Sequence, residues 1–538
     1  MVDEFEFDTT TRPTIVENDP NIAEESDEYV SDKEGEPATE PATEPQATSA
    51  EPTKQEASGE TSLVLLFVHV GILAAVSGWV NAVVPDPYMD EVFHIPQAQY
   101  YCVQKYSVWN PKITTPPGLY AISDLFITPV GLFTSAFICT PSFLRAINRI
   151  FSIITYLILA RLLASVHARR GVADDQLALA ALALVMFPVA YFYNFLYYTD
   201  SGSTLFVLWA YLCARDGRYM WSGIISAISV TFRQTNIVWV CFLLGISLVR
   251  ILSTDLKVLQ PKKSESEDDA KDDEARLYNP LVAEVASIGQ VLTSIASLIR
   301  LTFKHLPYLL EQLYSFVLTL AGFVAFVIWN DGIALGDRAN HVAGLHVPQL
   351  FYFASFAAFF AAPAILSMDL VRRAVLGPVT GGFRRLGTLI VTAVGMLFLV
   401  DRFTMEHPFL LSDNRHYTFY VWKNIYRRHS LARYALVPAY MGAGWALLQP
   451  LTTTLPLLDL LAYLAAVTLT LVPSPLLEFR YFILPFLMYM VHVPVPGKGR
   501  LVAMCAAYAA VNAWTVYMFL WKGFEWETEL GKVQRFMW

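Results

Sequence analysis

The sequence predicts an all-α polytopic membrane protein with roughly 11 to 14 transmembrane helices. Of its 538 residues, 55% are hydrophobic and only 16% are charged, whereas soluble globular domains average about 25% charged residues. Apolar stretches close to the ~20 residues that a helix needs to cross a bilayer recur along the chain. The main departures from this pattern are the acidic start of the chain and one charged segment near its middle.

Residues 1–60 are expected to be a disordered acidic tail. Their charge is carried almost entirely by Asp and Glu, interleaved with Pro, Thr and Ser. Such a segment buries too little apolar surface to offset the entropy lost on ordering. The tail also supplies much of the net charge of −9, so the net charge says little about partners of the core. We expect no nucleic-acid partner. No cleavable signal peptide precedes the first apolar stretch, which is expected to act as a retained signal-anchor.

The membrane core is expected over residues 61–538. The candidate spans lie at 63–84, 117–138, 143–164, 176–193, 203–215, 221–250, 307–329, 350–370, 386–401, 434–450, 457–473, 480–493 and 501–521. The stretch 221–250 is interrupted by the polar run Arg233–Asn236. Broken helices are tolerated only where they line a cavity or are buried in protein.

Charge distribution predicts which segments share a side of the membrane. Residues 252–304 contain a charged insertion that we expect to be solvated. Basic pairs such as Arg169-Arg170 and Arg384-Arg385 flank other spans. The positive-inside rule assigns the insertion, these pairs and the tail to the cytoplasmic side. The loop 85–116 and the later polar stretches are then expected on the opposite face.

The loop after the first span holds the strongest candidate for chemistry, the adjacent carboxylates Asp90 and Glu91, with His94 close behind. Two carboxylates beside a membrane span are costly to keep near lipid, so a function is expected for them. A carboxylate whose pKa is tuned by burial and neighbours can act as a general base. The alternative is a solvated helix N-terminus, where acidic side chains gain from the helix dipole.

Further candidate side chains lie in other polar stretches, and each has a structural alternative. Arginine offers a planar donor fork that suits phosphate, but a rigid entry turn, an interfacial aromatic belt or a local Glu–Arg pair would also explain these stretches. His341 and its neighbours lack the spacing of a metal site, so no metal is expected. The candidates are Lys112, Arg233, Asp337, His341, Asn414, Arg415, His416, Tyr417 and Arg480.

Other motif classes are absent from the sequence. The five cysteines indicate no disulfide framework, and without a Cys-x-x-Cys motif a thiolate zinc site is not expected. No phosphate-binding glycine loop or dinucleotide fingerprint is present, so neither a soluble nucleotide-sugar donor nor a cofactor is expected. A sugar carried on a polyprenyl phosphate is compatible with the candidate Arg, Lys and His residues.

Seven motifs resemble, in order, those of the dolichyl-phosphate-glucose-dependent α-1,2-glucosyltransferases of the endoplasmic reticulum. They are Pro87–Gln99, Lys112–Tyr120, Tyr197–Asp200, Arg233–Asn236, Gly336–Val342, His407–Tyr417 and Pro473–Tyr481. The resemblance implies a membrane glycosyltransferase of class C in the endoplasmic reticulum membrane, with its catalytic loop 85–116 in the lumen. It implies dolichyl phosphate glucose as donor and a diglucosylated, dolichyl-diphosphate-linked oligosaccharide as acceptor. Transfer of the last glucose in α-1,2 linkage, with inversion, would complete the N-glycan precursor.

The expected mechanism assigns a role to most candidates. Asp90 is expected to be the general base, with Glu91 as its rival or orienting partner. Arg415, Arg480 and Lys112 would stabilise the charge on the departing dolichyl phosphate, and His416 would donate a hydrogen bond to it. Asp337, Asn414 and Arg233 would orient sugar hydroxyls or brace the site.

Two alternative functions remain at this point. One is another dolichyl-phosphate-sugar transferase of the same fold, which only the longer motifs distinguish. The other is a membrane transporter, since broken helices and charges near the membrane suit transport as well. A transporter predicts polar residues throughout the spans and an internal repeat. The polar residues are instead concentrated at one face and no clear repeat is found, which favours an enzyme.

Overall fold

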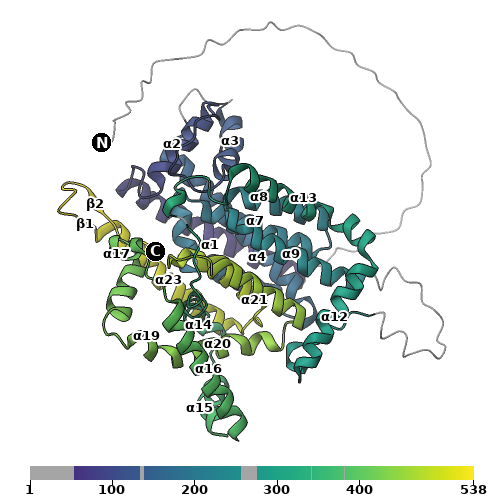
Figure 1. The fold of residues 1–538 in the computed structure, drawn as a ribbon. Helices are drawn as coiled ribbons and strands as arrows, with labels where there is room; N and C mark the ends of the chain where they lie inside the picture. Colours follow the sequence, from purple (N-terminus) through teal and green to yellow (C-terminus); the bar gives the residue numbers. More distant parts are fainter. Residues whose placement is uncertain (1–53, 132, 134–137, 256–275, 341, 381) are drawn as a thin grey trace, which may run out of the picture. The chain divides into compact units, whose positions relative to one another are not determined.

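The computed structural model describes residues 54–131, 133, 138–255, 276–340, 342–380 and 382–538 (Figure 1). Its helices are α1 (Lys54–Val83), α2 (Glu91–Cys102), α3 (Gly118–Gly131), α4 (Pro141–His167), α5 (Asp174–Val185), α6 (Pro188–Phe192), α7 (Thr199–Arg215), α8 (Tyr219–Phe232), α9 (Ile237–Arg250), α12 (Ile288–Lys304), α13 (Leu306–Asn330), α14 (Gln349–Ile365), α15 (Met368–Thr380), α16 (Gly382–Phe403), α17 (Pro408–Ser412), α18 (Tyr417–Val421), α19 (Ala432–Ala435), α20 (Val437–Thr452), α21 (Leu457–Leu471), α22 (Ile483–His492) and α23 (Lys498–Trp521). Short 3-10 turns that matter for the site are η2 (Tyr193–Phe195), η3 (Gln234–Asn236) and η8 (Phe479–Phe482). The two-residue strands β1 (Phe524–Glu525) and β2 (Val533–Gln534) pair antiparallel as a small hairpin.

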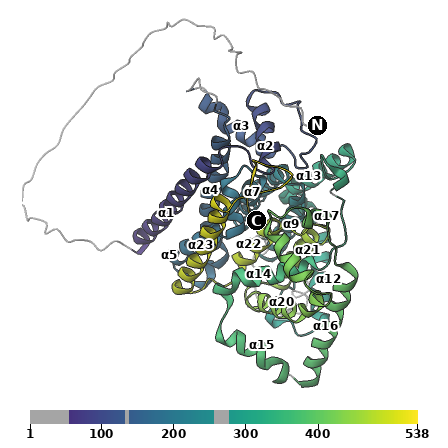
Figure 2. The ribbon, with the colours of Figure 1, turned by 90° about the vertical axis from the view of Figure 1, so that its left-hand side faces the viewer.

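The helices pack on one another around a single large apolar core. One group consists of α4, α7, α8 and α13, each of which packs against the next, and α9 lies against α7, α8 and α13 (Figure 1). The first helix, α1, lies beside α4, α5 and α23 (Figure 2). Local sequence sets the helix starts: Thr140 caps α4 by accepting a hydrogen bond from the Phe143 amide, and Pro141 follows at the first helical position.

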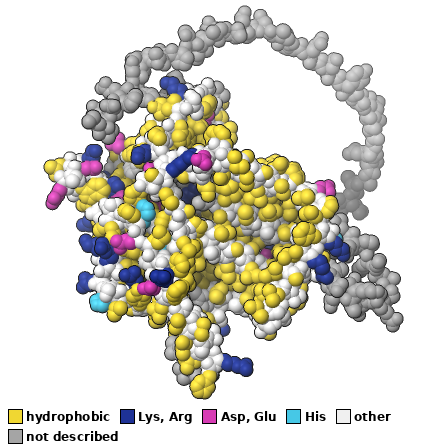
Figure 3. Space-filling model, viewed as in Figure 1, with side chains coloured by type: hydrophobic (Ala, Val, Ile, Leu, Met, Phe, Trp, Pro, Cys, Tyr) yellow, Lys and Arg dark blue, Asp and Glu magenta, His cyan; other side chains and the backbone are white. Residues whose placement is uncertain are grey.

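The prediction of an all-α polytopic membrane protein is confirmed. Six helices are long and apolar enough to cross a membrane, and three shorter apolar helices accompany them among the described residues. Hydrophobic side chains cover the middle of the face in Figure 3, whereas charged side chains gather mainly along its left margin, where Figure 1 places α17 and the hairpin. The total of roughly 11 to 14 spans stays a prediction.

The predicted break within 221–250 is confirmed. Helix α8 ends at Phe232, the chain continues through η3, and α9 begins at Ile237. The Asn236 amide group donates to the main-chain oxygen of Ser229 and to the Ser203 hydroxyl, both at 2.8 Å. These side-chain hydrogen bonds satisfy polar groups that the broken helix would otherwise leave unpaired in a buried environment.

The two predicted extramembrane segments are described only in part. Residues 1–53 of the acidic tail lie outside the described residues, and α1 begins at Lys54, inside the range 1–60 expected for the tail. Residues 256–275 of the charged insertion also lie outside the described residues. The later part of the insertion contains the amphipathic helix α12, which begins with a capping box between Ser287 and Gln290.

The expectation that the cysteines form no disulfide is wrong. Cys102, at the end of α2, is bonded to Cys139, just before α4. The two residues are 37 positions apart and neither lies in a Cys-x-x-Cys pattern, so spacing carries no sign of the pair. Only the tertiary structure brings them together. The bond ties the helix that begins with Glu91 to the start of α4.

Candidate active site

The acidic loop between α1 and α2 places two neighbouring carboxylates in different environments. Pro85 and Pro87 prevent α1 from continuing, because proline has no amide hydrogen and disfavours a helical residue before it. Met89 then adopts a left-handed backbone conformation with φ of 56°, and α2 begins directly after Asp90. The turn directs Glu91 inward, where its side chain is fully buried, whereas the side chain of Asp90 remains 39% exposed.

Glu91 forms a buried ion pair with Arg145 of α4. Both oxygens of its carboxylate accept from the Arg145 guanidinium, at 2.6 and 2.9 Å, and both side chains are 0% exposed. The main-chain amides of Tyr88 and Tyr197 also donate to this carboxylate, at 3.0 and 2.6 Å. With four donors around it, Glu91 joins the acidic loop to α4 and to the turn before α7.

Asp90 is paired with Arg480 of η8, which lies 390 positions further along the chain. The Nη1 of Arg480 donates to Oδ2 of Asp90 at 3.1 Å, and the Asp90 amide donates to the Tyr198 hydroxyl at 3.1 Å. Among the described residues no hydrogen bond is found for Oδ1. Burial raises the pKa of Asp90, but the charge and hydrogen bond of Arg480 outweigh it, so the pKa lies below its ordinary value. Asp90 is therefore an ionised carboxylate with one oxygen available to a proton donor.

A second carboxylate shares the guanidinium of Arg480. Glu478, two residues before it, accepts from Nε and Nη2 of Arg480. Close by, Arg233 after α8 forms an ion pair of 3.0 Å with Asp200 in the first turn of α7. The ring of Tyr481 lies near both arginines, with its centroid 5.9 Å from the guanidinium carbon of each. The structure thus brings Arg233 and Arg480 to the same site as Asp90.

His94 lies one helical turn after Asp90 and faces the same region. Its Nδ1 shares a hydrogen bond of 2.5 Å with the Tyr120 hydroxyl of α3, and its ring lies 6.2 Å from that of Tyr198. Burial lowers the pKa of His94 to about 4, so the imidazole is neutral at physiological pH. It therefore acts as a neutral hydrogen-bonding group rather than as a cation.

The loop that carries the candidate residues 414–417 is linked to the acidic loop by the last residues of the sequence, which contact both loops. Arg415 forms a two-point ion pair with Asp413, at 2.7 and 2.8 Å, and its guanidinium lies 4.6 Å from the centre of the Trp526 ring. That indole donates to Oδ1 of Asn414 at 2.9 Å. The side chains of His416 and Tyr417 lie against Trp538, with His416 Nδ1 2.9 Å from its main-chain oxygen.

Lys112 and Asp337 lie on two loops that touch each other. The amides of Asp337 and Leu335 donate to the carbonyl oxygens of Pro111 and Thr114, at 3.1 and 3.2 Å. A β-carbon at Gly336 would overlap the Pro111 carbonyl, so only glycine permits this approach. The Lys112 side chain is exposed, and no ion pair is found for it among the described residues. His341 lies outside the described residues.

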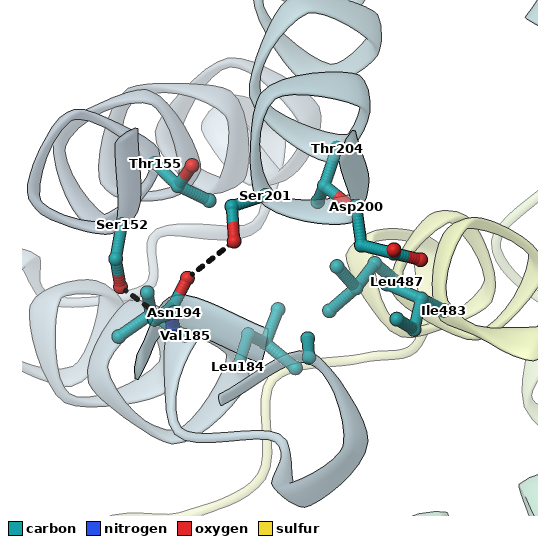
Figure 4. Close-up of a pocket in the computed structure, with 11 residues that line it drawn as sticks. Ser152, Thr155, Leu184, Val185, Asn194, Asp200, Ser201, Thr204, Ile483 and Leu487 are labelled. Atoms are coloured by element: carbon teal, nitrogen blue, oxygen red, sulfur yellow. Dashed lines mark hydrogen bonds between the residues drawn. The ribbon is translucent and has the colours of Figure 1, made fainter. Parts of the chain in front are cut away.

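A small cavity with several polar side chains in its wall is lined by residues that include Asp200 of the site. Figure 4 shows Ser152, Asn194 and Ser201 joined by two hydrogen bonds, of 3.1 and 2.8 Å, with Asp200 on another side of the cavity. About 20 Å³ is open to the centre of a water molecule, and one water needs roughly 10–15 Å³. A water molecule therefore fits here, but a sugar or a lipid phosphate does not.

Sequence reasoning did not select several contributors to this site, among them Glu478, Arg145, Asp200 and Tyr198. Arg145 lies in the predicted span 143–164, and a charged residue in an apolar segment is itself a signal of function or of a buried partner. Asp200 stood inside a quoted motif without being selected as a candidate. Tyr198 stood in the same quoted motif but was not selected, because a tyrosine near a membrane boundary is typical of the aromatic belt. No group of three metal-ligating side chains occurs among the described residues.

The family comparison covers most of the chain. A model described as the DIE2/ALG10 family matches residues 84–491. The chain is 41% identical over 460 residues to the Rattus norvegicus protein named Dol-P-Glc:Glc(2)Man(9)GlcNAc(2)-PP-Dol alpha-1,2-glucosyltransferase, covering 84% of this chain and 93% of that protein. Proteins of the same name from Homo sapiens and Arabidopsis thaliana are 40% and 32% identical, covering 84% and 85% of this chain and 93% and 96% of theirs.

The likeness to solved structures is much weaker. The apo oligosaccharyltransferase of Archaeoglobus fulgidus is 14% identical with a TM-score of 0.31, and the match covers 84% of this chain and 55% of that chain. A second structure of that protein, in complex with an inhibitory peptide and a dolichol-phosphate, gives a TM-score of 0.32 at 11% identity, with the same shares covered. At these scores the likeness carries no argument.

Proposed function

The chain belongs to the DIE2/ALG10 family, and from this premise we propose that it is a dolichyl-phosphate-glucose-dependent α-1,2-glucosyltransferase. It transfers glucose from dolichyl phosphate glucose to the terminal glucose of the diglucosylated, dolichyl-diphosphate-linked oligosaccharide. The observation that carries this function is 41% identity to a relative of that name over 84% of the chain. The fold is then that of the membrane glycosyltransferases of class C, in the endoplasmic reticulum membrane with the site facing the lumen.

Asp90 suits the role of general base better than Glu91 does. A base needs an oxygen that can reach the acceptor hydroxyl, and the half-exposed carboxylate of Asp90 has Oδ1 available. Glu91 is fully buried and its carboxylate accepts four hydrogen bonds from protein groups. We assign Glu91 the orienting role, because it holds the backbone of the acidic loop from which Asp90 projects.

In the proposed reaction the acceptor's 2-hydroxyl oxygen bonds to C1 of the donor glucose on the face opposite the phosphate. The bond between C1 and the phosphate oxygen breaks, and its electron pair leaves with dolichyl phosphate. The hydroxyl proton passes to Oδ1 of Asp90. A single displacement inverts the configuration at C1, so a β-linked donor yields the α product.

The departing phosphate gains negative charge, which nearby cations stabilise. Lys112 is the candidate that can do so without giving up a partner, because its side chain is exposed and no ion pair is found for it among the described residues. Arg480 and Arg415 are already paired with Glu478 and Asp413. Each arginine can bind the phosphate only if its ion pair partly opens, or if its guanidinium binds the carboxylate and the phosphate together. His416 would add a hydrogen bond to the phosphate.

The experiment that tests the function is glucose transfer by the purified protein in chelator, with dolichyl phosphate glucose and the diglucosylated lipid-linked acceptor. Formation of the triglucosylated product supports donor, acceptor and linkage together. Asp90→Asn should reduce kcat by about 10²–10⁴-fold. Asp86→Asn is the matched control, since Asp86 is an exposed aspartate of the same loop. Equal turnover in the two variants would reject Asp90 as the base.

The alternatives predict different results from the same preparation. Transfer of mannose from dolichyl phosphate mannose, without glucose transfer, would indicate another dolichyl-phosphate-sugar transferase. Uptake of solute into proteoliposomes without sugar transfer would indicate a transporter. Recovery of transfer only when divalent cation is added would move Asp90 from base to metal ligand.

A further inference from the structure

The last six residues of the sequence, Val533–Trp538, lie against the candidate site. They begin with strand β2 of the β1–β2 hairpin, which turns the chain back after α23, and in Figure 1 the final residue lies inward of that hairpin. Met537 in this 533–538 segment is fully buried, although the hairpin tip nearby is exposed, with Leu530 81% exposed. A buried end after an exposed hairpin indicates that the segment is held by specific contacts.

The first set of contacts joins the 533–538 segment to the acidic loop. The Tyr88 hydroxyl donates to the main-chain oxygen of Arg535 at 3.0 Å and accepts from its amide at 2.7 Å. The Arg535 guanidinium donates to the carbonyl oxygens of Phe519 and Leu520 in the last turn of α23, both at 2.9 Å. Tyr88 is two residues before Asp90, so the segment holds the loop that carries the proposed base.

The second set joins the segment to the loop that carries Arg415. The Met537 amide donates to the Arg415 carbonyl at 2.9 Å, and the Tyr417 amide donates to the Met537 carbonyl at 3.1 Å. The side chain of Gln534 accepts from Nη1 of Arg415 at 3.0 Å. Both the backbone and the guanidinium of this loop are therefore placed by the 533–538 segment.

The third set comes from Trp538. Its main-chain oxygen accepts from the Tyr193 hydroxyl and from Nδ1 of His416, both at 2.9 Å. Its indole ring lies 5.0 Å from the Tyr417 ring and 5.9 Å from the Phe479 ring. Phe479 directly precedes Arg480, so the indole packs on the turn that presents the guanidinium to Asp90.

We propose that the 533–538 segment is a positioning element of the transferase site, and that Trp538 within it is a positioning residue for Arg480 and His416. Three segments far apart in the sequence supply the charged groups, around residues 88–90, 413–417 and 478–481, and this segment contacts all three. The inference rests on the proposed function. Trp538 acts through the groups it holds and need not touch substrate.

The consequence for catalysis follows from geometry. Loss of the indole removes the ring contacts that hold Phe479 and Tyr417, so Arg480 and His416 gain freedom while the main-chain contacts of the segment remain. Misplacing a reacting or stabilising group by about 1 Å can reduce turnover by as much as 100-fold. Looser contact with Arg480 also raises the pKa of Asp90, whose charged and titratable neighbours are Arg480, Glu478, His94, His416, Tyr120, Tyr193 and Tyr198.

The test compares Trp538→Ala, Trp538→Phe and Leu530→Ala in the full-length protein, with kcat, KM for each substrate and a pH profile of kcat. Trp538→Ala should lower kcat about 10- to 100-fold with little change in KM, and should move the acidic limb of the profile to higher pH. Trp538→Phe keeps a ring against Tyr417 and Phe479 and should recover most of kcat. Leu530→Ala, on the exposed hairpin tip, should match the wild type.

Several outcomes overturn the inference. Wild-type kcat and an unchanged pH profile in Trp538→Ala would overturn it, as would a loss of kcat that merely follows the amount of folded protein and that Trp538→Phe does not rescue. Failure of the proposed function looks different: the wild type and Leu530→Ala would also transfer no glucose, and the inference that rests on it would fall as well.

Discussion

Replacing Glu91 by glutamine should separate a structural carboxylate from a catalytic one. Glu91 and Arg145 are both completely buried, with their closest atoms 2.6 Å apart. Glutamine has nearly the same shape but no charge, so Arg145 would keep its charge without a counter-ion. Removing one partner of a buried ion pair typically destabilises a protein by about 3–5 kcal/mol.

The structure places the expected loss for Glu91→Gln toward the lower end of that range, about 3 kcal/mol. Arg145 also donates to the carbonyl oxygens of Val84 and Asp86 and to the side chain of Asn81, at 2.6, 2.9 and 3.2 Å. These acceptors remain in the variant and partly offset the lost charge. The amides of Tyr88 and Tyr197 keep an acceptor in the glutamine oxygen, although a weaker one.

The assay is denaturant unfolding of the detergent-solubilised protein, together with turnover measured where each variant is folded. A double-mutant cycle with Arg145→Gln should give a coupling energy of at least about 2 kcal/mol, because the pair interacts directly. Asp90→Asn is the matched comparison: it should lose turnover and retain stability. The reasoning would be refuted if Glu91→Gln unfolded like the wild type and lost turnover as completely as Asp90→Asn, since Glu91 would then be the base.

Three other predictions test the surroundings of the proposed base. Arg480→Gln should move the acidic limb of the kcat profile to higher pH, because the guanidinium lowers the pKa of Asp90; an unchanged limb would contradict this. The pKa of His94 lies at about 4 in the folded protein and near 6.5 in an unfolded chain. Stability should therefore fall by up to about 3 kcal/mol as the pH drops from 6.5 to 4, and His94→Gln should show a flatter pH dependence of unfolding. Cys102→Ser should lower the free energy of unfolding by about 4 kcal/mol, as expected for a disulfide closing a loop of 37 residues; reductant should destabilise the wild type equally and leave the variant unchanged.

Much of the fold was accessible from local sequence. Apolar stretches near the thickness of a bilayer predicted a helical membrane protein, and the break at Arg233–Asn236 was visible as a polar run inside an apolar segment. These features depend on residues close together in the chain, where helix propensity, proline and charge act directly. The paired cysteines were not accessible in this way, because nothing in their local sequence indicates a partner 37 residues away.

For the site, the sequence by itself determined which side chains are available for chemistry and that they fall in polar stretches between apolar ones. It placed Asp90 ahead of Glu91 as the expected base but did not exclude Glu91, because two adjacent carboxylates have the same local surroundings. Only the tertiary structure distinguishes them: Arg145 reaches Glu91 from α4, and Arg480 reaches Asp90 from a turn 390 residues away. Burial, ion pairing and the contacts of Trp538 depend on which segments the packed helices bring together, and that information is not contained in any short stretch of sequence.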